Sequence, residues 1–77
     1  MTIDKQLQHM TAALERYAVT LAYYSERHIE ATVQSDREAL AEMQQEIRSI
    51  LWRREQLLLL RERYVTVRAL QMAEEAN

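Results

Sequence analysis

The sequence predicts an all-α protein in which two antiparallel helices form a coiled-coil-like hairpin. Glycine and proline are absent from the 77 residues, so the chain lacks the residues that best form the tight turns of a sheet protein of this size. Ala, Leu, Glu, Gln, Arg and Met, the strongest helix formers, make up most of the chain. A chain this short allows one domain at most, and we take residues 1–77 as a single helical domain.

A heptad pattern defines the first helix, which we expect over about residues 3–33. Thr2 is a suitable N-cap, and Asp4 lies in the first turn, where the helix dipole favours a negative charge. Apolar and aromatic residues recur at alternating spacings of four and three, which is typical of a coiled-coil seam. The row is Ile3, Leu7, Met10, Leu14, Tyr17, Leu21, Tyr24, His28 and Ala31.

The heptad pattern of the first helix ends before residue 35, and a second helix is expected over about residues 36–74. Ser35 and Glu38 have the spacing of a capping box, with Ser35 as N-cap and Glu38 at the third helical position. We therefore predict a turn at about residues 33–36. Because no Gly or Pro enforces this break, one continuous helix is the alternative. The row predicted to face the first helix is Leu40, Met43, Ile47, Leu51, Leu58, Val65 and Met72.

In such a hairpin the numbers of paired residues add up to about 70, so Tyr24 is expected near Ile47 and Leu7 near Tyr64. The second helix is then long enough to overhang the first by several residues at its C-terminal end. We expect its last turns to fray, because Glu74 lies near the negative end of the helix dipole.

The second helix carries more apolar surface than one neighbouring helix can cover. Four consecutive leucines at 57–60 circle its axis, and a helix that is apolar all round is a buried helix. A two-helix monomer lacks the interior for this. The sequence therefore predicts that self-association or a partner protein completes a helical bundle. The second apolar stripe, away from the hairpin seam, is formed by Trp52, Leu59, Val67 and Leu70.

Charge is unevenly distributed along the chain, although the net charge is only −2. Residues 1–46 hold four basic and eight acidic side chains, a balance of −4, whereas residues 47–68 hold six Arg against two Glu, a balance of +4. The arginines at 54, 61 and 68 recur every seven residues and have three interpretations: pairing with Glu on a neighbouring helix, binding an acidic protein, or tracking nucleic-acid phosphates. The predicted partner-binding residues are Trp52, Leu59, Leu60, Val67, Leu70, Arg53, Arg54, Arg61 and Arg68.

No motif for catalysis, cofactors or metals is recognised, so we expect a protein that is not an enzyme. There is no nucleophile–base pair and no Gly-rich phosphate loop, and His9 and His28 have no second ligand at metal spacing. We expect no catalytic, cofactor-binding or metal-binding residues and no small-molecule substrate. The longest apolar run is too short for a membrane span. The absence of cysteine and of a signal-peptide pattern fits a cytoplasmic location.

The stretch from Glu26 to Leu60 resembles the helical hairpin of small export chaperones that serve flagellar and type III secretion systems. In that family a long first helix leads through a short turn with an acidic residue into a Leu-rich amphipathic helix. The corresponding residues here are Ser35-Asp36-Arg37-Glu38-Ala39-Leu40, followed by Ile47, Ile50, Leu51 and the leucines at 57–60. The resemblance implies a cytoplasmic chaperone that masks an aggregation-prone export subunit, often within a heterocomplex.

The expected function is therefore a non-enzymatic protein–protein interaction module, such as a chaperone or adaptor that masks a helical or hydrophobic segment of a partner. The alternative is a homodimeric four-helix-bundle regulator that binds RNA or DNA through the Arg-rich second helix. In architecture the chain is similar to plasmid copy-number regulators of that kind. The interleaved Glu55 and Glu62 oppose phosphate binding, which makes a nucleic-acid partner the less favoured hypothesis.

Overall fold

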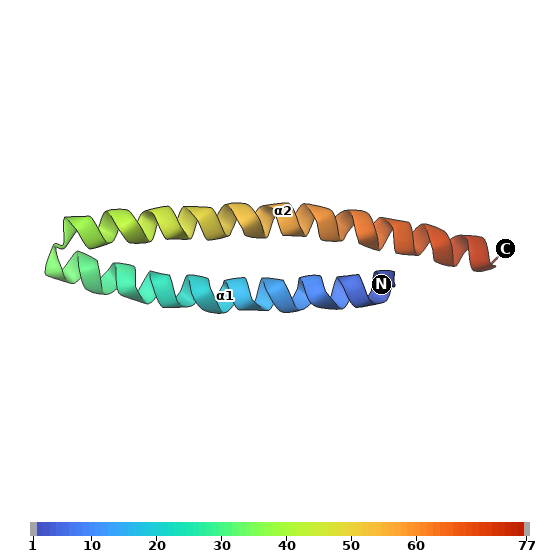
Figure 1. Cartoon of the computed structure of the whole chain (residues 1–77), viewed down its shortest axis with the longest axis horizontal. Coiled ribbons are helices and arrows are strands. Elements are labelled where there is room, and N and C mark those ends of the chain that lie inside the picture. The colour runs from blue at the N-terminus through green and yellow to red at the C-terminus, as the bar shows by residue number, and fades with distance from the viewer. Residues whose placement is uncertain (1, 77) are drawn as a thin grey trace.

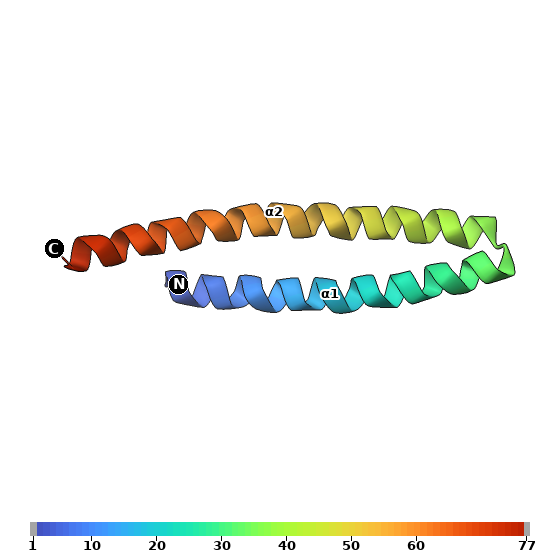
Figure 2. The same ribbon diagram turned by 180° about the vertical axis from the view of Figure 1, so that it is seen from behind.

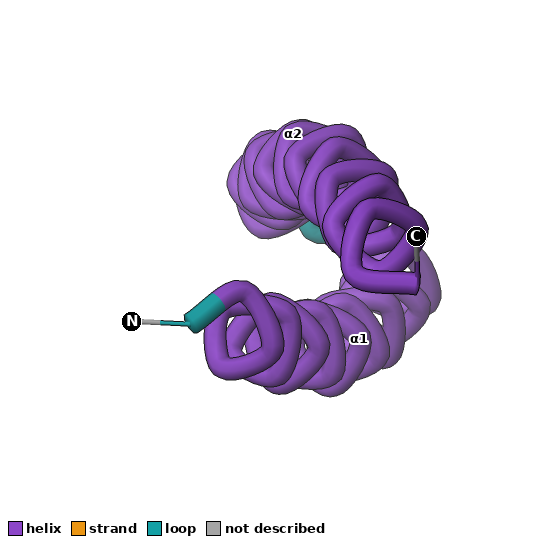
Figure 3. Tube along the Cα trace, turned by 90° about the vertical axis from the view of Figure 1, so that its right-hand side faces the viewer, coloured by secondary structure: helices purple, strands orange, loops and turns teal. Residues whose placement is uncertain are grey.

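Two long antiparallel helices make up the fold, as the sequence predicts. The computed structural model describes residues 2–76, so both ends of the domain expected over 1–77 lie outside the described residues. Helix α1 spans Ile3–Gln34 and α2 spans Arg37–Ala76. They lie side by side in a hairpin measuring 63 × 17 × 15 Å (Figure 1), so the single continuous helix is not formed. Seen along the long axis, the two helices cross rather than run strictly parallel (Figure 3).

Helix α1 begins as its cap predicts. Thr2 has an extended backbone, and its side-chain oxygen accepts a hydrogen bond from the Lys5 N–H at 3.3 Å. The Thr2 carbonyl accepts from the Gln6 N–H at 3.1 Å, which starts the regular ladder of the helix. Asp4 lies in the first turn, where its negative charge interacts favourably with the positive end of the helix dipole.

The turn between the helices is short and differs from the predicted capping box. Ser35 has a left-handed backbone (φ 56°, ψ 34°) and ends α1, with its N–H donating to the Thr32 carbonyl at 3.2 Å. The Asp36 N–H donates to the Ala31 carbonyl at 3.0 Å, so the last carbonyls of α1 are satisfied by the turn itself. Asp36 then caps α2, because its Oδ1 accepts from the Ala39 N–H at 3.1 Å.

The predicted assignment of Ser35 as N-cap of the second helix is therefore wrong, by one residue. An N-cap residue has an extended backbone, and the left-handed conformation of Ser35 serves the end of α1 instead. With Asp36 as the cap, Glu38 is at the second helical position and adds a favourable negative charge to the first turn of α2.

The seam of α1 is the one that the heptad pattern predicts. Each of the nine predicted residues is buried or half-buried, and Met10 and Ala31 are the most enclosed, with 8% and 4% of their surface exposed. The seam continues over the whole helix, so α1 contributes one continuous apolar edge to the hairpin.

The seam of α2 departs from the predicted row after its first three residues. Leu40, Met43 and Ile47 are half-buried against α1 as expected. Beyond them the contact passes through Ile50, which is only 6% exposed, and through the half-buried Leu57 and Tyr64. The predicted interface residues Leu51, Leu58, Val65 and Met72 are exposed, so this part of the prediction is wrong.

The reason is that the α2 seam follows heptads counted from Met43. Steps of seven from Met43 lead to Ile50, Leu57 and Tyr64, and a helix keeps the same edge toward its neighbour over such steps. The row that contains Leu51 and Leu58 lies one residue later and is turned by about 100° around the helix axis.

Helix α2 has 40 residues against 32 in α1, and its last turns project past the start of α1 (Figure 2). This confirms the predicted overhang. Every residue from Val65 to Ala76 is exposed, so the end of α2 has no covering neighbour among residues 2–76.

Candidate partner-binding surface

From Leu51 onward, α2 exposes most of the large apolar side chains that the hairpin leaves uncovered. Within residues 2–76, α1 covers only one edge of this helix, and its other sides have no neighbouring helix. The exposed residues on this part of the chain are Leu51, Trp52, Leu58, Leu59, Leu60, Val65, Val67, Leu70 and Met72.

These side chains occupy three sides of α2. At about 100° per residue, Trp52, Leu59 and Leu70 lie close to one line on the side away from α1. Leu60 and Val67 lie on one flank of that line. The other flank is formed by the row Leu51, Leu58, Val65 and Met72, which we call the heptad row.

All nine predicted partner-binding residues are exposed on α2. Trp52 and Leu70 are the most open of the apolar ones, with 64% and 61% of their surface exposed, and Leu59 follows with 51%. Their position on the molecular surface is what a docking role requires. Sequence reasoning missed that the heptad row is exposed as well. The spacing of seven from Met43 to Tyr64 competes with the same spacing in the heptad row, so only the pairing with α1 tells the two apart.

The three arginines spaced by seven lie between the heptad row and α1. Arg68 donates from Nε to Asp4 Oδ1 at 2.8 Å, with the two side chains 50% and 65% exposed. Arg61 faces Thr11 and Glu15 of α1 across a shallow groove. The placement of Arg68 agrees with the first of the three interpretations in that it pairs with the neighbouring helix, but its partner is an aspartate and not the expected Glu.

Arg53 lies on the opposite flank of α2 from the heptad row and is exposed. The nine predicted residues are therefore not one patch. Arg54, Arg61 and Arg68 border the groove between the helices, whereas Arg53, Leu60 and Val67 lie around the helix on its far side.

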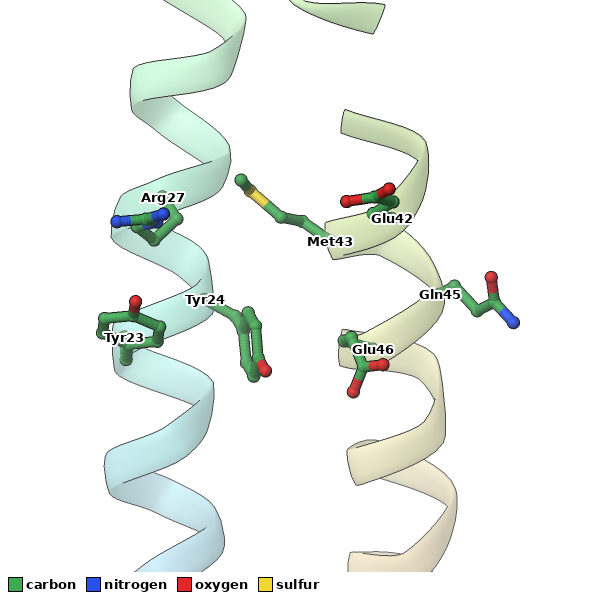
Figure 4. A pocket seen from close by; sticks show the side chains of 7 residues that line it. All are labelled: Tyr23, Tyr24, Arg27, Glu42, Met43, Gln45 and Glu46. Atoms are coloured by element: carbon green, nitrogen blue, oxygen red, sulfur yellow. The ribbon is translucent and has the colours of Figure 1, made fainter. Parts of the chain in front are cut away.

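Near the turn, aromatic residues of α1 meet the start of α2. Tyr24 and Met43 point into the space between the helices, whereas Gln45 points away from it (Figure 4). Tyr23 is exposed, its ring lies edge-on to that of Tyr24 with 5.4 Å between centroids, and the Arg27 guanidinium lies 5.5 Å from the Tyr23 ring centre. Tyr24 therefore packs in the seam, and Tyr23 presents an aromatic face with a cation above it.

The histidines of the chain lie in different environments. His28 is half-buried in the seam beside Ile47 and Gln44, and His9 is exposed. Within residues 2–76, no group of three or more His, Cys, Asp or Glu is arranged to hold a metal ion. Neither described helix is apolar enough along its length to cross a membrane.

The total exposed surface is large for a chain of this mass. The hairpin exposes 6403 Å², whereas a globular monomer of 9.2 kDa is expected to expose roughly 4,900 Å². The fully unfolded chain would expose roughly 13,300 Å², so folding into the hairpin covers only about half of it. A second layer of protein would bring the buried fraction to that of an ordinary domain.

Comparison with known proteins gives no relative: no family model, no curated protein and no solved structure matches the chain.

Proposed function

We propose that this chain is a non-enzymatic protein–protein interaction module, a small cytoplasmic chaperone or adaptor that masks a helical or hydrophobic segment of a partner. The observation that carries the proposal is the exposed line of Trp52, Leu59 and Leu70 along the outer side of α2. Trp and Leu at these exposures are costly to leave in water, and Trp is among the residues most favoured at the centres of protein interfaces.

The arrangement of the hairpin supports the same function. Helix α1 buries one edge of α2, and the apolar side chains on the other sides of this continuous helix are presented at regular intervals. A rigid helix that presents side chains at regular intervals is a recurrent way of recognising another helix or a hydrophobic segment. The resemblance to export chaperones of flagellar and type III secretion systems points to a partner that must be kept from aggregating.

The test is capture of the partner from the native host by the intact chain and by Trp52→Ala and Leu59→Ala variants. Both substitutions should weaken capture while leaving the helical content unchanged by circular dichroism, because neither side chain lies in the seam. The matched control is Val19→Ala, which removes a side chain that is 72% exposed on α1, away from the proposed surface. It should capture as well as the intact chain.

Two results would count against the proposal. Capture that is equally weak with Val19→Ala would mean that the surface of α2 is not the one that binds. A purified chain that forms a defined dimer in sedimentation equilibrium, dissociated by Trp52→Ala, would favour the homodimeric regulator. In that case, affinity for RNA that falls steeply with salt would assign the Arg-rich helix to phosphate binding.

A further inference from the structure

We draw no further inference here: the strongest candidate, the heptad row of exposed apolar residues along α2, carries nothing because Glu55 and Glu62 line the same hollow as Arg61, so charge selects no partner, and nothing in the structure shows what covers the row.

Discussion

Arg68 Nε donates to Asp4 Oδ1 at 2.8 Å and joins α2, just before its overhang, to the first turn of α1. The pair fixes which residues lie level at the open end of the hairpin, where α1 has only Ile3 and Leu7 to offer as seam residues. Both side chains are at least half exposed, so water and salt compete with the ion pair. We therefore expect it to contribute little to the free energy of unfolding, and to favour this alignment of the two helices over others.

We predict that a double-mutant cycle with Asp4→Asn and Arg68→Gln gives a coupling free energy below about 1 kcal/mol. Asp4→Asn alone should cost more than Arg68→Gln, because Asp4 also interacts with the α1 dipole. Urea unfolding followed by circular dichroism measures both values, and the coupling should fall further in high salt. A coupling above about 2 kcal/mol that persists in salt would mean that the pair is shielded from water.

Ser35→Gly should stabilise the hairpin by about 0.5–1 kcal/mol, because Ser35 holds a left-handed backbone that glycine adopts without a steric cost. The control is Gln34→Gly, one residue earlier and still within α1, which should destabilise by a similar amount. Thermal unfolding of the two variants beside the intact chain decides the sign. If Ser35→Gly lowered the midpoint, the left-handed turn would not be the structure in solution.

Asp36→Ala should cost about 1 kcal/mol through loss of the cap on the Ala39 N–H, whereas Ser35→Ala should stay within a few tenths. The two substitutions separate the observed cap from the capping box that the sequence suggests. Equilibrium unfolding in urea is the measurement. A larger cost for Ser35→Ala than for Asp36→Ala would restore Ser35 as the cap of α2.

Local signals account for what the sequence predicts correctly. The seam of α1 and its Thr2 cap follow from spacing and residue type within one helix, and both are confirmed. The N-cap of α2 is misplaced by one residue because Ser35 and Asp36 are both good caps, and only the hydrogen bonds of Asp36 to Ala31 and Ala39 separate them.

The seam of α2 is harder to predict for a related reason. Its second half has leucine at consecutive positions, so periodicity alone does not select Leu57 over Leu58 as the residue that faces α1. The choice depends on pairing with α1 along the entire hairpin. This choice also decides which row of α2 remains exposed. The sequence therefore predicts that the candidate surface lies on α2, but it does not predict which side of the helix forms it.

Ile50→Ala should destabilise the hairpin by about 2–4 kcal/mol, because Ile50 is 6% exposed and its removal leaves a void in the seam. Leu51→Ala, the next residue, should cost only about 1 kcal/mol because Leu51 is 45% exposed. Urea titrations of the two variants under identical conditions give the comparison. Equal costs would indicate that Leu51 is covered in solution, either by a shifted seam or by a second copy.

The substitution Arg61→Leu tests whether the arginine at this position makes the hairpin less stable than an apolar residue would. Arg61 faces Leu7, Thr11 and Glu15 across the groove, where an apolar side chain would pack against α1. We expect the substitution to raise the free energy of unfolding by about 0.5–1 kcal/mol, because Leu would bury more apolar surface against α1 than Arg does. The control Arg63→Leu lies on the outer side of α2 and should leave stability within a few tenths.

Urea unfolding of Arg61→Leu and Arg63→Leu under identical conditions gives the comparison. A loss of stability would instead place Arg61 among the groups that hold α1 against α2, through its neighbour Glu15.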